Sequence, residues 1–532
     1  MKKIVLAAMA LTVGLSAAAQ DTYESARLLG SDLNGTARYV GMGGAMEALG
    51  ADISTIGTNP AGIGMFRHSQ ANVSFGFVSQ QDVQKFDGLG KTNMSFDQVG
   101  FVYTNRISDR SFINFSFNYH KSRNFDQILS AAGRLNGQSV NGLSYRKAEI
   151  GNSNRGGYDL DFNNKDVMIG YENSSQDALQ AQTYSQLDYM NANALLLDAN
   201  YMALREKGQP YLFSMDGDNY TFDRAHRGWI NDYDFNMSGN SDDRFYWGIT
   251  VGIKDVNYKG YTEYTEGLTG SEGDLGYVNY GDDRRIKGTG FDLTAGVIVR
   301  PVEESPFRIG LSVKTPTWYD LTTENQSTVL NYAKYGAEDE WSSGESYDFK
   351  FYTPWKFGVS LGHTVGSNLA LGASYEYSDY GASRNRINDG YDYYGNDESY
   401  TDELQKRNAE SSLNGVHTLK LGAEYKPVPE LSVRLGYNLQ SAAYDDNGYR
   451  DQMLDSPGVM YASTADYTNW KATNRITCGL GYKAGKMNID LAYQYSTTNG
   501  DFYPMQSYEG KINAVDVSNK RHQMLLTLGY SF

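Results

Sequence analysis

From residue 70 onward, the sequence consists of about fourteen segments in which apolar and polar residues alternate. In the segment 487–495 every odd-numbered position is apolar, from Met487 to Tyr495, and the positions between hold Asn, Asp, Ala and Gln. Side chains of a β-strand point alternately to opposite faces, so each segment predicts a strand with one apolar and one polar face. Such strands can build soluble β-domains or a transmembrane barrel.

The lengths of the connections between these segments distinguish the two folds, because short and long connections alternate along the chain. The short ones lie at 107–109, 240–242, 301–305, 366–367, 427–429 and Gly485. The long ones lie at 81–95, 124–227, 260–287, 321–345, 381–413, 445–472 and 498–519. Short turns at one rim and long loops at the other are typical of outer-membrane barrels. We therefore predict an all-β fold, a transmembrane antiparallel β-barrel of about fourteen strands over residues 70–532, rather than two smaller soluble β-domains.

The amino-terminal residues predict export. A basic start, Met1-Lys2-Lys3, is followed by an apolar run to Leu15 and by small residues up to Ala19. This order is that of a secretory signal peptide, and the run is too short for a membrane-spanning helix. We expect residues 1–19 to be removed, with cleavage after Ala19 or Gln20, and the mature protein to lie in the outer membrane of a Gram-negative bacterium.

Composition excludes several classes of protein. After the leader no run of 18 apolar residues occurs and the mean hydropathy is -0.55, so a helical membrane protein is excluded. The 43 Tyr suit the interfacial girdles of a barrel, and only 10 Pro are present to break strand ladders. The single cysteine, Cys478, allows no disulfide framework. A formal net charge of -16 argues against nucleic acid as a partner.

Two regions depart from the alternation. Residues 20–69 are rich in Gly and Ala and are too many for a leader and too well patterned for a disordered tail, so we predict a compact plug, or hatch, inside the barrel lumen. Residues 124–228 form a connection too long for a plain loop, so we predict a large, partly helical extracellular loop.

The amino-terminal region carries a resemblance to a known family. The order of Arg38, a Gly43-Gly44-Ala turn, an Ala-Asp pair and then Asn59-Pro60-Ala61 before the first strand resembles FadL-type transporters of long-chain fatty acids and aromatic hydrocarbons. The segment 352–358 resembles the Pro-x-x-Phe strand pair of that family. The last strand, which ends on Phe532, resembles the assembly signal that the barrel-assembly machinery recognises in outer-membrane barrels. The hatch residues implied by the resemblance are Arg38, Gly43, Gly44, Asn59, Pro60, Ala61 and Gly62.

The resemblance implies passive, ligand-gated uptake of hydrophobic small molecules such as long-chain fatty acids, by a monomer surrounded by outer-membrane lipids. In the family, ligand leaves sideways at a kink in the third strand. Residues 112–121 of this chain contain no Gly or Pro to mark such a kink.

The long connection contains a helical pattern at 177–204, with an apolar face. Two interpretations stay open: a cap that buries its own core, or an external groove that captures hydrophobic ligand. The ligand-binding candidates are Met65, Phe66, Met190, Leu197, Tyr201 and Leu204, and Ala194 lies on the same helical face.

No chemistry-bearing motif appears in the sequence. The six His, at 68, 120, 226, 363, 417 and 522, lack the spacing of a helical metal site, and no nucleophile elbow, phosphate loop or haem-attachment motif occurs. We expect no enzyme activity, no metal and no cofactor. The alternatives to hydrophobic uptake are a polar-solute porin, a plugged surface-binding or adhesive barrel, and, more weakly, haem uptake.

Charged residues give three further expectations. The acidic pairs Asp282-Asp283 and Asp445-Asp446 should lie in solvated loops. The lumen charges Arg434, Arg300 and Glu424 should pair with one another or with the plug. Position 491 should face lipid and position 490 the lumen, so Leu491→Arg should cost about 2–4 kcal/mol while Asp490→Arg should be tolerated.

Overall fold

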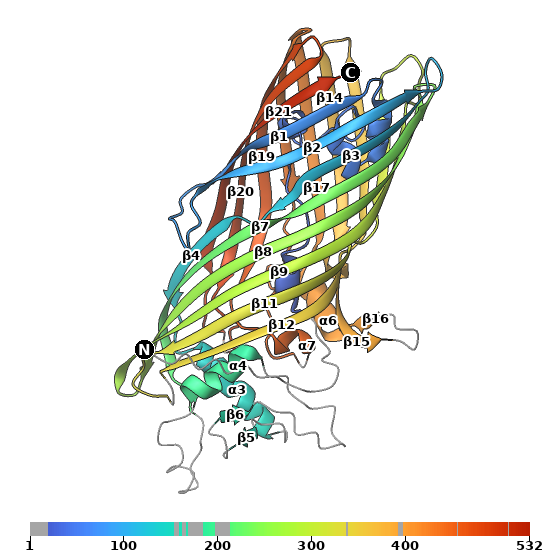
Figure 1. The fold of residues 1–532 in the computed structure, drawn as a ribbon. Helices are drawn as coiled ribbons and strands as arrows, with labels where there is room; N and C mark the ends of the chain where they lie inside the picture. Colours follow the sequence, from blue (N-terminus) through green and yellow to red (C-terminus); the bar gives the residue numbers. More distant parts are fainter. Residues whose placement is uncertain are drawn as a thin grey trace, which may run out of the picture.

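The computed structural model describes residues 20–153, 159–161, 166–168, 185–196, 213–336, 339–391, 397–454, 456–508 and 510–532. Its strands form one antiparallel sheet that closes on itself, because β1 (Gln70–Gln80) pairs with β21 (Val515–Ser531) over its whole length. In the described residues the wall is a closed barrel of fourteen strands, several of them interrupted (Figure 1). The predicted fold class is confirmed.

The wall strands between β1 and β21 are paired mainly with their neighbours in the chain. They are β2 (Thr92–Arg106), β3 (Phe112–Asn124) continued by β4 (Gln127–Arg134), β7 (Asp216–Ser241), β8 (Phe245–Gly270), β9 (Gly273–Val299), β10 (Arg308–Lys314) continued by β11 (Trp318–Asn331), β12 (Glu340–Tyr352) continued by β13 (Lys356–Val365), β14 (Leu369–Asp379) continued by β15 (Arg384–Tyr391), β16 (Asp397–Thr401) continued by β17 (Gly415–Val428), β18 (Leu431–Gln440), β19 (Tyr467–Ala484) and β20 (Met487–Tyr503).

The outside of the wall carries an apolar belt beside the rim with the short turns, which we call the turn rim. On β20, Met487, Ile489 and Leu491 are 47, 40 and 42% exposed, while Asn488 and Asp490 point inward. The exposed apolar side chains of the other strands continue this belt around the molecule. Apolar residues outside and polar residues inside reverse the order of a soluble protein, so the belt is the lipid-facing surface of a transmembrane barrel.

Three wall strands are far longer than a membrane requires. The strands β7, β8 and β9 contain 26, 26 and 27 residues, whereas roughly 9–11 residues cross a bilayer. The outward face of β8 is apolar from Phe245 to Ile253 and then polar, with Lys259 exposed. The wall therefore continues well beyond the belt toward the opposite end, which we call the loop rim.

The predicted long loops at 260–287 and 321–345 are wrong. The first is the continuation of β8 into β9 through a two-residue turn, and the second contains most of the hairpin of β11 and β12. Beyond the belt the inward face mixes apolar residues such as Val256 and Leu268 with polar ones such as Thr262, so a search for apolar residues alone does not find the alternation. Asp282 and Asp283 accordingly lie in β9, and Asp282 is buried.

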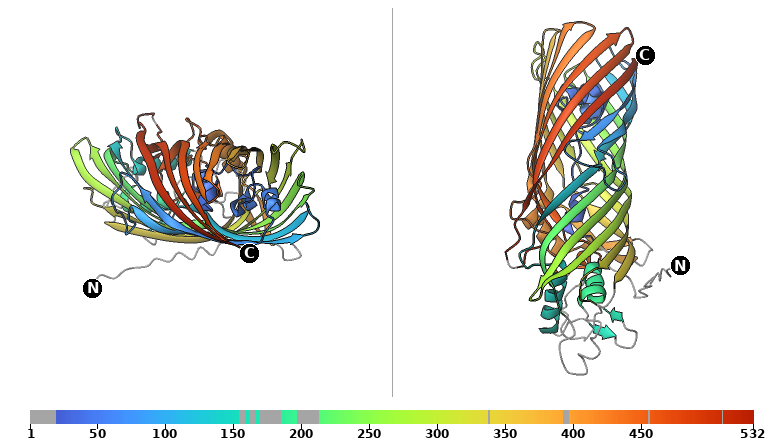
Figure 2. Two further views of the ribbon diagram at one scale, coloured as in Figure 1. Left: turned by 90° about the horizontal axis from the view of Figure 1, so that it is seen from above. Right: turned by 90° about the vertical axis from the view of Figure 1, so that its left-hand side faces the viewer.

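The remaining elements lie in the lumen or at the loop rim (Figures 1 and 2). Those at the loop rim are α3 (Val140–Ser153), β5 (Asp159–Asp161), β6 (Asp166–Met168), α4 (Gln186–Asn191), η3 (Ala192–Leu196), α6 (Glu403–Ser412) and α7 (Pro457–Met460); the turn η4 (Tyr380–Ala382) links β14 to β15. Within the described residues no helix combines the length and the apolar character needed to cross a bilayer.

Residues 20–66 lie inside the barrel as four short helical turns joined by loops (Figure 2). The turns are α1 (Thr22–Ala26), α2 (Ala37–Gly41), η1 (Ile53–Gly57) and η2 (Pro60–Met65). Each begins at a capping side chain that accepts a backbone N–H, namely Asp21, Thr36, Asp52 and Asn59. Nearly all of the segment is buried, so we call it the inner segment.

Candidate functional site

The inner segment rests with its backbone directly on the backbone of the wall. Eight wall strands, from β8 to β19, present a glycine at the contact, and we call this set the glycine track. Its members are Gly248, Gly296, Gly310, Gly362, Gly372, Gly422, Gly436 and Gly479. A methyl group on Gly372 would lie 1.9 Å from the carbonyl oxygen of Ala45, and one on Gly436 would lie 2.2 Å from the backbone nitrogen of Gly43. Only glycine allows this approach.

The middle of the glycine track is continuous from strand to strand. Gly362 is paired with Gly372, Gly372 with Gly422, and Gly422 with Gly436, across four successive wall strands. On the other side of the contact, Gly43 and Gly44 have φ angles of 63° and 80°, a left-handed conformation that favours glycine. The predicted hatch glycines thus permit both the turn and its close contact with the wall.

Arg38 ties the inner segment to a charged chain on the wall. Its guanidinium donates to both carboxylate oxygens of Glu424, at 3.0 and 3.2 Å, and to the backbone oxygen of Ala51 at 3.0 Å. Glu424 also accepts from Arg434 at 2.7 Å, and Arg434 pairs with Asp490 at 2.6 Å. The predicted pairing of Arg434 and Glu424 with each other and with the inner segment is confirmed.

One expectation about charges is wrong, and a second is revised. Arg300 donates instead to backbone oxygens of Glu303 and Ser305 at the turn rim. The tolerance expected for Asp490→Arg is unfavoured by the pairing of Arg434 with Asp490, because the new guanidinium would face Arg434 after the carboxylate partner of Arg434 had been removed.

The Asn59-Pro60-Ala61-Gly62 sequence forms the start of η2 against the wall. The Asn59 side chain accepts from the backbone of Ala61 at 3.2 Å, and Pro60 occupies the first helical position, where its missing N–H costs nothing. The wall glycines Gly296 and Gly310 leave the space that Asn59 fills. The backbone oxygen of Gly62 accepts from Ala51 at 3.0 Å, which ties η2 to η1.

The remaining predicted ligand-binding residues fall into three groups. Phe66 packs with Ile53 and Ile63, and Met65 against another small apolar cluster, so neither lines the two cavities described below. Met190 and Ala194 are buried against wall residues such as Phe502, as parts of a cap over the barrel mouth. Leu197, Tyr201 and Leu204 lie outside the described residues.

The lumen contains two cavities separated by residues 29–34 of the inner segment. The outer cavity, of about 240 Å3, lies toward the loop rim, and the inner cavity, of about 150 Å3, lies toward the glycine track. Leu29, Ser31, Asp32 and Asn34 line both, so we call residues 29–34 the partition. Asp32 is held to the wall by its backbone N–H, which donates to Ser122 at 2.8 Å, and by its carboxylate, which accepts from Asn124 at 2.8 Å.

The outer cavity is both cationic and apolar. Six cationic side chains face three carboxylates in its lining: Arg27, Arg123, Arg224, Lys471, Arg475 and Arg521, against Asp32, Asp97 and Asp466. Among the described residues, Arg123 and Arg475 have no carboxylate within ion-pair distance; Arg475 donates to the amide oxygens of Asn438 and Gln440 at 2.8 and 3.2 Å. Apolar side chains such as Leu29, Phe125 and Leu129 complete the lining.

His226 reports the electrostatic environment of this cavity. Burial, together with the neighbouring Arg27, Arg224 and Arg123, holds the pKa of His226 well below its usual range. The imidazole is therefore neutral at pH 7, and the positive charge of the cavity resides on the guanidinium groups. An anionic group inside the cavity would find donors that are already charged.

The wall beside the outer cavity contains a break in its hydrogen-bond ladder. The pairing of β2 with β3 runs from Arg106 to Gln98 and stops, whereas β2 continues to Thr92 along β1. The third strand bulges at 121–123 and is interrupted between β3 and β4, and β4 then pairs only with β7. The far end of the break is closed by Gln80, whose side chain donates to and accepts from the backbone of Ile128, both at 2.8 Å.

The break borders the outer cavity, since Asp97, Arg123 and Phe125 line that cavity. Asn34 of the partition lies across it, donating to Asp97 at 3.0 Å and to the backbone oxygen of Lys121 at 2.9 Å. The search for Gly or Pro in 112–121 missed this feature because the interruption lies at Phe125–Asp126, outside that range and without either residue.

The fold has counterparts among solved structures. No protein-family model matches the sequence, and no curated protein is significantly similar to it. Solved structures with a similar fold include FadL-family transporters. The Ralstonia pickettii toluene transporter TbuX has 11% identity and a TM-score of 0.47, with 94% of this chain and 99% of TbuX covered. A Pseudomonas aeruginosa FadL homologue has 12% identity and a TM-score of 0.48, with 98% and 100% covered. Such weak likeness says nothing about the ligand.

Proposed function

We propose that this chain is an outer-membrane channel of a Gram-negative bacterium for the passive, ligand-gated uptake of hydrophobic molecules that carry an anionic head, such as long-chain fatty acids. It would be inserted by the barrel-assembly machinery and act as a monomer surrounded by outer-membrane lipids. No covalent chemistry is involved. The observation that carries the proposal is the outer cavity, which combines unpaired guanidinium groups with apolar side chains beside a break in the wall.

A carboxylate head fits this cavity better than an uncharged hydrocarbon does. A guanidinium binds a carboxylate through two parallel hydrogen bonds, and Arg475 at present has only amide oxygens as acceptors. An apolar chain would lie against Leu29, Phe125 and Leu129, where its burial contributes about 0.8 kcal/mol per methylene group. Toluene-like ligands have no carboxylate, so they would gain only the contribution from burial against the apolar side chains.

The partition is the proposed gate, and the inner segment is the proposed plug. The segment 41–65 is held by the glycine track, so its movement would disturb contacts on eight strands. The partition has fewer ties, chiefly the bonds of Asp32 and Asn34 to the wall and the bond that Arg123 donates to the backbone oxygen of Leu29. A ligand in the outer cavity opens the gate only if it binds the open state more tightly than the closed one.

The break beside β2 is the proposed exit. The alternative route continues through the inner cavity, whose lining includes Lys254, Lys314, Lys356, Glu376 and Lys420. An apolar chain would displace water from these charged groups without replacing their hydrogen bonds, which is unfavourable. Sideways departure through the break leads instead to the lipid-facing belt.

Uptake by purified protein in liposomes tests the proposal. Entry of a long-chain fatty acid, toluene and a small sugar would be compared for wild type and for Arg123→Gln with Arg475→Gln. We expect fatty-acid entry to fall roughly tenfold or more, which corresponds to about 1.4 kcal/mol, with toluene entry unchanged. The matched control is Arg244→Gln, because Arg244 donates to Pro301 at the turn rim. Sugar entry without fatty-acid entry would instead indicate a porin. If none of the three compounds enters, the result would indicate a surface-binding barrel.

A further inference from the structure

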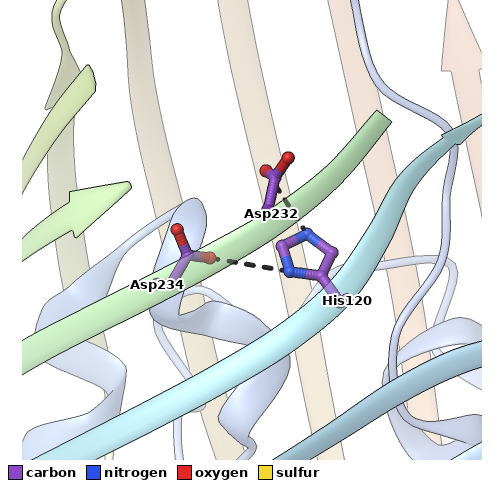
Figure 3. A group of neighbouring side chains, drawn as sticks. All are labelled: His120, Asp232 and Asp234. Atoms are coloured by element: carbon purple, nitrogen blue, oxygen red, sulfur yellow. Dashed lines mark ion pairs between the residues drawn. The ribbon is translucent and has the colours of Figure 1, made fainter. Parts of the chain in front are cut away.

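A histidine and two aspartates meet on the inner wall, away from the outer cavity (Figure 3). His120 comes from β3, and Asp232 and Asp234 come from β7. His120 is paired directly with Asp232 in the ladder, and Asp234 lies two positions further along the same face. The group lies beside the inner cavity, since His120 and Asp232 line it.

Asp234 lacks the partners that a buried carboxylate requires. It is 1% exposed, and neither of its oxygens has a hydrogen-bond donor among the described residues. Asp232, by contrast, accepts from Ser122 at 2.6 Å and from Lys254. Asp292 on β9 contacts Lys254 and Lys314, at 3.4 and 3.1 Å. An ionised carboxylate in such a place is costly unless a positive charge accompanies it.

The spacing of the donor atoms suits a shared metal ion better than hydrogen bonds. Nδ1 of His120 lies 3.5 Å from Asp234, and Nε2 lies 3.7 Å from Asp232, both longer than a normal hydrogen bond. Only one of these nitrogens can bind a given ion; Nε2 is the freer one, because Nδ1 also lies 3.3 Å from the side-chain nitrogen of Asn118. One donor atom from each of the three residues lies within 4.8 Å of the others. Ligands at about 2.0–2.1 Å from a tetrahedral zinc ion stand roughly 3.4 Å apart, so the three side chains would close in by small rotations when they share one ion.

We propose that His120, Asp232 and Asp234 bind a divalent transition-metal ion such as Zn2+. One imidazole nitrogen and two carboxylates are a donor set that this ion accepts, and the inner cavity leaves room for a water ligand. The ion supplies the positive charge that Asp234 lacks. It lies against the inner segment, because a side-chain carbon on Gly57 would be only 3.2 Å from Asp234. This site is independent of the proposed transport.

Metal content of the folded full-length protein tests the site. Wild type, Asp234→Asn, His120→Gln and Asp97→Asn would be treated with EDTA, dialysed against Zn2+ and analysed by mass spectrometry. We expect one bound Zn2+ in wild type and none above background in Asp234→Asn and His120→Gln. Asp97→Asn is the matched control, because Asp97 is also buried on the inner wall and, among the described residues, one of its oxygens lacks a donor and no histidine lies within ion-pair distance. We expect it to bind like wild type.

Two further readouts guard against misfolding and adventitious binding. The melting temperature should rise with Zn2+ in wild type and in Asp97→Asn, and stay constant in Asp234→Asn. Co2+ in place of Zn2+ should give the visible absorption of a four-coordinate site with nitrogen and oxygen ligands. Equal zinc content in wild type and folded Asp234→Asn would overturn the proposal, and so would a wild type without zinc; His120 would then be only a counter-charge for the two carboxylates.

Discussion

Single glycines decide how closely the inner segment lies on the wall. Gly436→Ala places a methyl group 2.2 Å from the backbone nitrogen of Gly43 and 2.4 Å from the backbone of Met42, so rotation of a side chain cannot relieve the clash. Overpacking of this kind costs typically about 1–3 kcal/mol. We expect the segment to be displaced and the single-channel conductance for small ions to rise above that of wild type.

Gly281→Ala is the control for this substitution. Gly281 is also a wall glycine, on β9, but a methyl group there meets only the hydroxyl of Thr328, at 2.8 Å. Its conductance should stay at the wild-type level. A rise of similar size in both variants would show that wall packing in general, and not contact with the inner segment, limits conductance.

The pair Asp490 and Leu491 tests the two faces of one strand. Leu491→Arg exposes a charge to lipid and should cost about 2–4 kcal/mol. Asp490→Arg leaves Arg434 without its partner and adds a second guanidinium, which by analogy with broken buried pairs costs about 3–5 kcal/mol. Urea unfolding in lipid vesicles measures both, and Asp490→Asn should fall between wild type and Asp490→Arg. Full stability of Asp490→Arg would contradict the role of the Glu424–Arg434–Asp490 chain.

The start of α3 provides a pH-dependent contact at the scale of an element. Both carboxylate oxygens of Glu266 lie 3.2 Å from the backbone nitrogen of Val140, and Glu266 is fully buried. Burial raises the pKa of Glu266 from 4.5 to about 8, although the bond to Val140 lowers it. The folded state therefore binds a proton that the unfolded state has lost, so the docking of α3 weakens as pH rises from about 4.5 through about 8 and is constant above.

Hydrogen exchange of residues 140–147 between pH 5 and pH 9, corrected for the intrinsic rate, measures this effect. In wild type the protection factors should decrease as the pH rises. In Glu266→Gln, which keeps the size of the side chain without the charge, they should not depend on pH. An unchanged slope in Glu266→Gln would assign the pH dependence to another group.

The partition, the proposed gate, also gives a prediction at the scale of an element. Asn34→Cys with Asp97→Cys, in a Cys478→Ser background, replaces a 3.0 Å side-chain contact by a pair of thiols. Oxidation should fix the partition to β2 and stop fatty-acid entry, and a reducing agent should restore it. Each single-cysteine variant should be insensitive to oxidant. Undiminished uptake by the oxidised double variant would place the gate elsewhere.

Elements near the belt could be predicted from the sequence, and elements away from it could not. Segments such as 487–495 alternate aliphatic and polar residues because one face meets lipid. Beyond the belt the outward face is polar and the inward face mixes apolar with polar residues, so the parts of β8 and β9 at 260–287 were predicted as a loop. The cluster of His120, Asp232 and Asp234 was likewise hidden, because it arises from pairing between strands that are more than a hundred residues apart.

At the scale of the whole molecule, the mouth lies far from the bilayer. From Ile253, the last apolar outward residue of β8, to its end at Gly270 the strand runs roughly 55 Å at about 3.3 Å per residue. We expect Lys259→Cys, in the Cys478→Ser background, to react with a membrane-impermeant maleimide added to intact cells. Ile249→Cys, in the belt of the same strand, should be protected until the membrane is dissolved. Protection of both positions would mean that the membrane covers more of the wall than the belt.

The glycine track also constrains the order in which the molecule is made. Its members come from strands spread between residues 245 and 484, whereas the backbone that rests on them lies between residues 41 and 65. The surface that receives the inner segment does not exist until β8 to β19 stand side by side. Contacts so distant in sequence form late, because the chain between them must first be ordered. The part of this barrel that is synthesised early is therefore among the last to reach its place.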